Sequence, residues 1–280
     1  MEIKASDVKA LREKTGAGMV DCKKALTEAD GDFARAEKIL KELGLAAVAK
    51  RSERATNEGR AFTLITPGRA GVLELSCETD FVARNEEFIA VGKEILAEAV
   101  KNNVTKPTES MEEKVKALIA KIKENMAIRR LALMPIEKDE CAAEYVHGEG
   151  VIGVVVKMKA DKPEVFSNEK VKALLFDFAL HVAAFNPMFL SKESVTPEYL
   201  KEQEEIFTKQ VAGMDKPQNV LQGIVKGKLN KLFTEICLLD QPFVKDDKKS
   251  VTQVLNELGK EVGAKLSISG YLFCKVGQEL

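Results

Sequence analysis

The chain has 280 residues, of which 45% are hydrophobic and 31% charged, so it can bury a core and is not disordered by composition. Its 43 Lys and Arg against 44 Asp and Glu give a formal net charge of −1, which argues against a protein that coats nucleic acid through a basic excess. The apolar runs fall short of the ~20 residues that span a bilayer, so no transmembrane helix is expected.

The N-terminus and the cysteines predict a cytoplasmic protein. The chain opens directly into charged helical sequence, so no signal peptide is expected. The five cysteines are widely spaced, without a Cys-x-x-Cys pair, which excludes a zinc ribbon or thioredoxin motif and is typical of reduced thiols. Two histidines, His147 and His181, make a histidine metal site or a Ser-His-Asp triad hard to assemble. We expect no metal and no cofactor.

Residues 1–54 predict a three-helix bundle followed by a linker. Ser6 is the expected first N-cap, glycines at 16 and 18 break the first helix, and Asp32 is placed to cap the third. Gly44 is the expected end of that third helix. Residues 50–60 are polar and without periodicity, as in a linker. The apolar stripes expected to form this small core are Val8 and Leu11; Met19, Cys22, Leu26 and Ala29; and Phe33, Ala36, Leu40 and Leu43.

The pattern changes period in residues 55–136. Alternation around 62–66 and 72–77, joined by a Pro-Gly turn, predicts a hairpin. Two amphipathic helices follow, and a strand through 128–134 ends at Pro135. This region is therefore expected to be a first α+β core subdomain.

Residues 137–190 and 240–280 predict a second subdomain of the same kind. A hairpin of 144–147 and 151–158 precedes a helix with Asn168 as N-cap, and 264–276 alternate as a terminal strand. Ser250 and Gln253 form a capping box for the last helix. Because strand-strand-helix occurs twice, the predicted fold class is α+β with two related subdomains.

Residues 191–239 are purely helical. Thr196 and Pro197 fit an N-cap followed by an N1 proline, and two apolar stripes joined by a short loop predict an antiparallel helical hairpin. Alone, such a hairpin leaves apolar seams open. It either docks on the body or pairs two copies of the chain as a homodimer.

Motifs of enzymatic chemistry are missing from the sequence. It contains no Gly-x-x-x-x-Gly-Lys-Ser/Thr, no Gly-x-Gly-x-x-Gly and no outstanding carboxylate pair, which favours a binding protein over an enzyme. One unusual segment lies between a strand and a helix, where Thr79 can cap a turn that starts with Asp80 and Phe81. The pattern favours Phe81 as a core staple, and the alternative is an exposed anchor for a partner.

The segment Thr79-Asp80-Phe81-Val82, preceded by Cys77, resembles the signature of the bacterial elongation factor Ts family. Residues 11–26 resemble the opening motif of that family. Further matches, at 125–130, 147–148, 181–184 and 241–244, occur in family order over nearly the whole chain.

The resemblance implies a guanine-nucleotide exchange factor for elongation factor Tu that acts in translation without covalent catalysis. It implies a ubiquitin-associated-like N-terminal bundle that docks on the partner's GTPase domain, two α+β subdomains, and a helical hairpin inserted in the second. The segment that dislocates Mg²⁺ from the partner falls on Thr79, Asp80, Phe81 and Val82.

Five further partner contacts are implied by the resemblance: Lys23, Ile122, Lys123, His147 and Val244. Lys123 stands where a small residue is expected. From the residues alone, Lys23 also fits a solvated face, Ile122 the core and His147 a turn. The other histidine, His181, lies on an apolar stripe and is expected in the core.

Two other functions remain open at this stage. One is a structural adaptor with a ubiquitin-associated-like bundle and a self-associating coiled coil. The other is an RNA-binding translation protein, although acidic residues interrupt its basic stretch and no aromatic residues are interleaved. That stretch consists of Lys114, Lys116, Lys121, Lys123, Arg129 and Arg130. We expect no direct nucleic-acid and no membrane partner.

Overall fold

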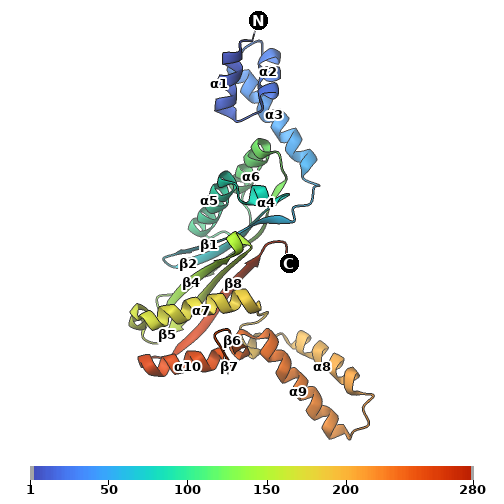
Figure 1. Ribbon diagram of the computed structural model, residues 1–280, viewed down its shortest axis with the longest axis vertical. Coiled ribbons are helices and arrows are strands. Elements are labelled where there is room, and N and C mark those ends of the chain that lie inside the picture. Colours follow the sequence, from blue (N-terminus) through green and yellow to red (C-terminus); the bar gives the residue numbers. More distant parts are fainter. Residues whose placement is uncertain (1–2, 279–280) are drawn as a thin grey trace.

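The computed structural model describes residues 3–278, with side chains for 3–44 and 51–278, and shows an elongated molecule (Figure 1). A helical bundle lies at one end and a pair of helices projects from the other, with two three-stranded antiparallel sheets between them and a third sheet of only two short strands, β6 (Pro242–Phe243) and β7 (Asp246–Ser250). The prediction of a mixed α+β fold that begins with a helical region is confirmed.

Three helices form the N-terminal bundle: α1 (Ala5–Thr15), α2 (Met19–Glu28) and α3 (Phe33–Arg51). Its core is small, and Leu11, Cys22 and Leu26 at its centre are fully buried. The space between the three helices holds few side chains. Two residues expected in this core, Met19 and Leu43, are therefore 44% and 54% exposed. Phe33 is also exposed.

The boundaries of the bundle differ from the sequence prediction in two places. The N-cap of α1 is Lys4, not Ser6, and its N–H donates to the Asp7 carboxylate (3.2 Å). α3 continues past Gly44 to Arg51, because Gly44 lies against Ala120 of a later helix and packing there outweighs the local end signal. The predicted linker is accordingly shorter, and the first strand begins at Glu58.

The first sheet has the strand order β1-β2-β3, all antiparallel. Its hairpin turns at Gly68, whose φ of +82° suits glycine. Between β2 and β3 the chain forms helices that cover one face, where Phe62, Leu73 and Phe88 are buried. The elements are β1 (Glu58–Thr66), β2 (Arg69–Cys77), α4 (Asp80–Ala83), α5 (Glu86–Asn102), α6 (Glu109–Ile122) and β3 (Met126–Pro135).

The second sheet repeats this arrangement with the order β4-β5-β8. Asn168 caps its main helix, α7, and Ser250 and Gln253 form the predicted capping box of α10. Its core includes Val154, Phe178 and Leu255. The elements are β4 (Glu140–His147), the 3₁₀ turn η1 (Gly148–Gly150), β5 (Ile152–Ala160), η2 (Pro163–Ser167), α7 (Glu169–Phe185), α10 (Val251–Val262) and β8 (Leu266–Lys275).

The two sheets pack against each other, so the helices lie on their outer faces. Small and β-branched side chains line the interface, among them Ala61, Val72 and Val155. Arg130 of β3 donates to the Phe273 carbonyl of β8 across it (3.1 Å). The central strands are therefore buried on both faces, which explains their nearly continuous hydrophobic sequence.

The projecting helices, α8 (Pro197–Val211) and α9 (Gln218–Ile236), follow α7 and precede α10 in the chain. They pack against each other and extend away from the sheets (Figure 1). Thr196 accepts the N–H of Tyr199 as the predicted N-cap (3.3 Å). A small cluster with Val195, Ile236 and Cys237 holds the base of the pair. Short connecting elements complete the chain: η3 (Lys192–Ser194), η4 (Leu238–Asp240), β6 (Pro242–Phe243) and β7 (Asp246–Ser250).

Candidate functional site

The corner between β2 and α4 has the predicted cap. Thr79 is extended (φ −127°, ψ 155°) and its Oγ1 accepts the Val82 N–H (3.4 Å), so α4 begins at Asp80 as a single turn. The Cys77 thiol donates to the Thr79 carbonyl behind it (3.1 Å). Burial and the nearby Glu124 carboxylate raise the pKa of Cys77 to about 12, so this thiol stays neutral and serves packing.

Phe81 is 82% exposed, so the interpretation of this ring as a core staple is wrong. The single turn of α4 directs Val82 and Ala83 into the core, both 8% exposed, where Phe88 is fully buried in the same cluster. Phe81 therefore points to solvent. Burying such a side chain would contribute roughly 1.5–3 kcal/mol. A large ring held outside the core on a short, anchored turn is suited to fill a pocket in another molecule.

Side chains from the loop between α6 and β3 anchor this corner. Glu124 accepts the Thr79 N–H at Oε2 (3.1 Å) and the Thr79 hydroxyl at Oε1 (2.8 Å). In the opposite direction, Glu78 accepts the Asn125 N–H at Oε1 (2.6 Å). The Asn125 side chain also donates to the Arg54 carbonyl (2.7 Å), which ties the end of the linker to the same place.

The α4 corner lies beside the turn of the second hairpin. Arg84, at the end of α4, approaches both Asp80 (3.7 Å) and Glu149 of η1 (3.5 Å). His147 precedes η1, is exposed, and has its Nδ1 2.9 Å from the Tyr145 hydroxyl. Since these ion pairs are exposed, their contribution to stability is small. Their geometry nevertheless places Asp80 and Phe81 in the same region of the surface as His147.

Lys23, Ile122 and Lys123 lie on the bundle and at its junction with α6. Lys23 is exposed on α2, as predicted for a solvated face. Ile122 is partly buried and packs against the first core. Lys123 ends α6 in the left-handed region (φ 70°), and its ammonium approaches Asp21 of the bundle (3.4 Å).

Val244 follows β6 and is 39% exposed. Its N–H donates to Nδ1 of His181 (3.1 Å), and Nε2 of that histidine lies 3.0 Å from the Gln241 side-chain oxygen. Because Nδ1 accepts, the ring is neutral and carries its proton on Nε2. Burial lowers the pKa of His181, in agreement with this state, and its predicted place in the core is confirmed. β6, which Val244 follows, lies beside α7 and α10, away from α4 (Figure 1).

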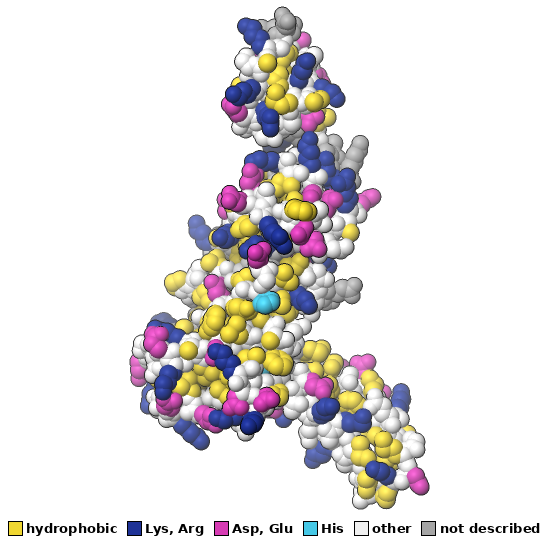
Figure 2. All heavy atoms as spheres, in the orientation of Figure 1, with side chains coloured by type: hydrophobic (Ala, Val, Ile, Leu, Met, Phe, Trp, Pro, Cys, Tyr) yellow, Lys and Arg dark blue, Asp and Glu magenta, His cyan; other side chains and the backbone are white. Residues whose placement is uncertain are grey.

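The exposed hydrophobic side chains do not cluster at one point. On the face shown in Figure 2, they run along the middle of the molecule from the helices of the first sheet to α7, between charged margins. Two of the exposed side chains next to the second hairpin turn are Val146 and Val151. Extended stretches of exposed hydrophobic side chains are typical of surfaces that contact another macromolecule.

The predicted basic stretch is largely neutralised by carboxylates in the structure. Lys114 pairs with Glu98 (2.6 Å) and Lys121 with Glu87 (2.6 Å). Lys116 approaches Glu112 on its own helix (3.7 Å). Acidic residues therefore accompany the basic residues of this stretch in the folded structure as well as in the sequence.

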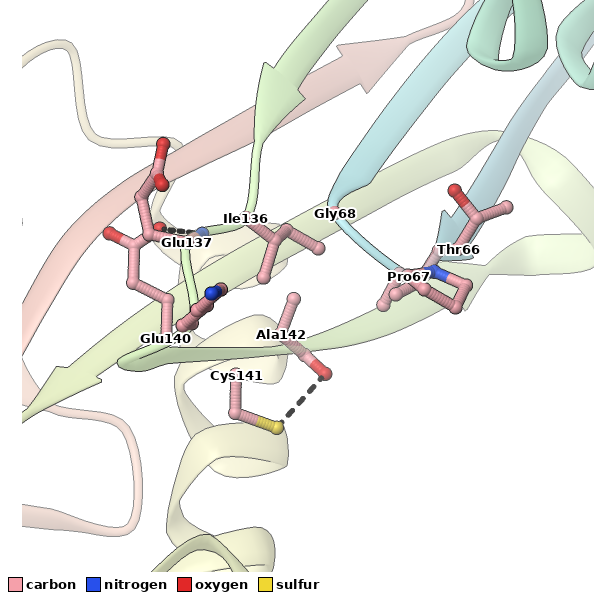
Figure 3. A pocket seen from close by; sticks show the side chains of 10 residues that line it. Thr66, Pro67, Gly68, Ile136, Glu137, Glu140, Cys141 and Ala142 are labelled. Atoms are coloured by element: carbon pink, nitrogen blue, oxygen red, sulfur yellow. Dashed lines mark hydrogen bonds between the residues drawn. The ribbon is translucent and has the colours of Figure 1, made fainter. Parts of the chain in front are cut away.

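An open hollow lies at the far end of the first hairpin, away from α4, between residues 65–68 and 136–142 (Figure 3). Cys141 and Glu140 line it, and the Glu140 carboxylate accepts the Glu137 N–H (2.9 Å). It contains none of the predicted site residues. Within residues 3–278 no group of three His, Cys, Asp or Glu is placed to hold a metal ion. In the same part of the chain, every helix is too short or too polar to cross a membrane.

The sequence pattern singled out Thr79, Asp80, Phe81 and Val82 but not the residues that support them. No role was predicted for Glu78, Glu124 or Asn125, because no periodicity marks them in their polar stretches; the family match at 125–130 was the one signal that pointed to Asn125. Thr79 and Glu124 are 45 residues apart in the chain, so only the three-dimensional structure reveals their contact.

Comparison with known proteins gives consistent matches. A family model described as Elongation factor TS matches residues 78–278, which include the α4 corner, His147 and Val244. The chain is 48% identical to an elongation factor Ts of Treponema denticola over 277 residues, 99% of each chain. It is 44% and 43% identical to those of Borrelia garinii subsp. bavariensis and Borreliella burgdorferi over 276 residues, 98% of this chain and 99% of each relative.

Proposed function

Because the chain belongs to the elongation factor Ts family, it is a translation elongation factor, and we propose that it binds GDP-loaded elongation factor Tu and promotes GDP release. The observation that carries this proposal is the 82% exposed Phe81 on an anchored corner. The proposal includes a cytoplasmic location, which the five free cysteines support.

We propose the same division into domains that the sequence predicts. Residues 1–54 form a ubiquitin-associated-like bundle and linker, and 55–136 form the first core subdomain. Residues 137–190 and 240–280 form the second, and 191–239 form the inserted helical hairpin. The matching order of β1-β2-β3 and β4-β5-β8 supports the division of the core into two related units.

The proposed mechanism acts on the partner's metal ion. A GTPase holds GDP through its phosphate loop and a Mg²⁺ that bridges to phosphate oxygens. Because Mg²⁺ requires near-ideal octahedral geometry, a small displacement of its supports weakens the site. Phe81 enters between elements of the partner, Thr79 and Asp80 set its angle, and Val82 anchors the turn from inside. The ring displaces the groups that support Mg²⁺, and the metal leaves before GDP.

The remaining proposed contacts position the factor on its partner. Lys23 contacts the GTPase domain from the bundle, together with Ile122 and Lys123 at the junction with α6. His147 contacts the partner beside the α4 corner, and Val244 binds at a distance from it. The bound chain and the bound nucleotide each lower the affinity of elongation factor Tu for the other by the same ratio. GTP binding can therefore expel the chain.

No covalent step is required in this mechanism, and all its energy comes from differential binding. The alternative of an adaptor without exchange activity has no observation that favours it. RNA binding is disfavoured by the carboxylate partners of Lys114, Lys116 and Lys121.

The helical hairpin is proposed to pair two copies of the chain. It exposes Ile206 on α8, Met214 in the connecting loop and Val220 on α9, each about 40% accessible. Analytical ultracentrifugation of the wild-type chain and of an Ile206→Asp variant tests this. A concentration-dependent dimer that the variant loses supports the pairing, and a monomer at all concentrations contradicts it.

The proposed activity is tested by the release of fluorescent GDP from elongation factor Tu after mixing with excess unlabelled GDP. Substoichiometric amounts of this chain should accelerate the release. An unchanged release rate, with binding of the two proteins shown separately, would contradict the exchange function and favour the adaptor.

A further inference from the structure

Two segments exchange carboxylate contacts at the α4 corner. Glu78 accepts the Asn125 N–H (2.6 Å), and Glu124 accepts the Thr79 N–H (3.1 Å), so each segment supplies an acid to the backbone of the other. The second oxygen of Glu124 accepts the Thr79 hydroxyl (2.8 Å). We call these four residues the reciprocal lock.

The hydroxyl of Thr79 performs two tasks in this lock. It donates its single proton to Glu124, which turns its lone pairs toward the Val82 N–H that it caps. A helix of four residues has too few internal hydrogen bonds to keep its own direction. The direction of α4, and with it that of Phe81, therefore depends on the orientation that Glu124 gives to Thr79.

The second sheet provides an internal comparison. Asp161, directly after β5, accepts the N–H of Lys265, directly before β8 (2.7 Å). This contact occupies the same place as that of Glu78 with Asn125, one residue beyond the paired strands. Both halves therefore have a carboxylate, just after the central strand, that accepts the backbone N–H just before the third strand. The Glu124 contact with Thr79 is found in the half that exposes a phenylalanine at its corner.

The surroundings of Glu124 connect this corner to the rest of the site. On one side, Lys123 approaches Asp21 of the bundle (3.4 Å), and on the other, Asn125 holds the Arg54 carbonyl at the end of the linker (2.7 Å). The segment 123–125 therefore contacts the bundle, the linker and the α4 corner at once.

We propose that Glu124 is a positioning residue for nucleotide exchange, which fixes the direction of Phe81 through Thr79 without touching the partner. The proposal rests on the proposed function of Phe81. It assigns a role to a carboxylate whose hydrogen bonds go to the chain's own corner, and charge-assisted bonds of this kind are stronger than neutral ones.

The first test is Glu124→Gln, which keeps the size of the side chain but replaces one accepting oxygen by an amide donor. The maximal rate of GDP release at saturating factor should fall about tenfold, the effect of losing one hydrogen bond to a charged group. The half-saturating factor concentration should change by less than about twofold, because the docking contacts elsewhere remain.

A double-mutant cycle separates positioning from a general structural role. If Glu124 acts through Phe81, Glu124→Gln should slow exchange in the wild-type background and have no further effect in Phe81→Ala. An equal loss in both backgrounds, or no loss in either, overturns the inference. If Phe81→Ala alone exchanges like wild type, the proposed function of the ring fails instead, so the two failures are distinguishable.

Variants of Thr79, which Glu124 contacts, and a control that removes the same charge elsewhere complete the experiment. Thr79→Val removes the hydroxyl and should resemble Glu124→Gln, whereas Thr79→Ser restores it and should be several-fold faster than Thr79→Val. Glu87→Gln removes the same charge at an exposed pair with Lys121 and should exchange like wild type. These variants also decide the matter if Glu124→Gln does not fold, because equal rates of Thr79→Val and Thr79→Ser contradict the inference.

Discussion

The two three-stranded sheets have the same topology, but the segment that follows the central strand has a different structure in each. In both, the central strand pairs with the third strand through a register shift, at Glu74/Leu75 in β2 and at Lys157/Met158 in β5. After β2 the chain forms α4 and exposes Phe81. After β5 it forms η2, where Val165 is buried and Phe166 packs against the core.

This difference shows how one topological position can serve either packing or recognition. The η2 turn has Pro163 at its first position, and its two hydrophobic residues complete the second core. In α4 the corresponding inward positions go to Val82 and Ala83, which leaves the aromatic ring outside. We therefore expect Phe81 to matter for exchange and Phe166 for stability.

The largest effect is expected for Phe81→Ala. The rate of GDP release from elongation factor Tu should fall roughly 30-fold, about 2 kcal/mol of interaction, as for the dominant residue of an interface. The free energy of unfolding should stay within about 0.5 kcal/mol of wild type, since the ring is exposed. Stopped-flow fluorescence and urea unfolding measure the two. Met188→Ala, which truncates another exposed hydrophobic side chain (59%), is the control.

Phe166→Ala should give the opposite result. Removing this partly buried ring should lower the free energy of unfolding by about 2 kcal/mol, below the range for a fully buried phenylalanine. The exchange rate per folded molecule should remain at the wild-type value. A slower exchange with unchanged stability would mean that the two corners do not differ as described.

The buried histidine of the second half predicts a pH dependence. Because burial lowers the pKa of His181 in the folded state, the unfolded chain binds a proton first as the pH falls through about 6.5. The stability contributed by the neutral ring is thus present above pH 6.5 and is lost as the pH falls toward the lower, folded pKa. Urea unfolding from pH 7.5 to 5.5 should show this loss, and His181→Asn should reduce its slope. Equal slopes in both proteins would contradict it.

The smallest effect concerns the helix ends of the two halves. α10, which precedes β8 as α6 precedes β3, ends on Gly263 in the left-handed region, the favoured residue there, whereas α6 ends on Lys123 in the same conformation. Lys123→Gly should relieve the backbone strain and raise the free energy of unfolding by about 0.5–1 kcal/mol, reduced by the loss of the exposed pair with Asp21. A decrease in stability in thermal unfolding would show that the ion pair outweighs the strain.

The sequence predicts best those features that depend on neighbouring residues. The caps at Thr79, Asn168 and Ser250 follow from side chains that reach backbone groups two or three positions away, and all three are confirmed. The end of α3 was misjudged because Gly44 is an end signal only while nothing packs against it.

The candidate site was predicted in part for the same reason. Its residue types came from a resemblance, but the exposure of Phe81 depends on which neighbours fill the core first. The contact between Thr79 and Glu124 joins residues far apart in the chain, so no local sequence pattern predicts it.

The most direct test of the account is the Mg²⁺ dependence of GDP release with wild-type chain and with Phe81→Ala. If the ring acts by displacing Mg²⁺, the wild-type chain should be much faster at millimolar Mg²⁺, and the two should converge when the metal is chelated, because the step that Phe81 assists is then complete. A rate difference that stays the same with and without Mg²⁺ would contradict the account.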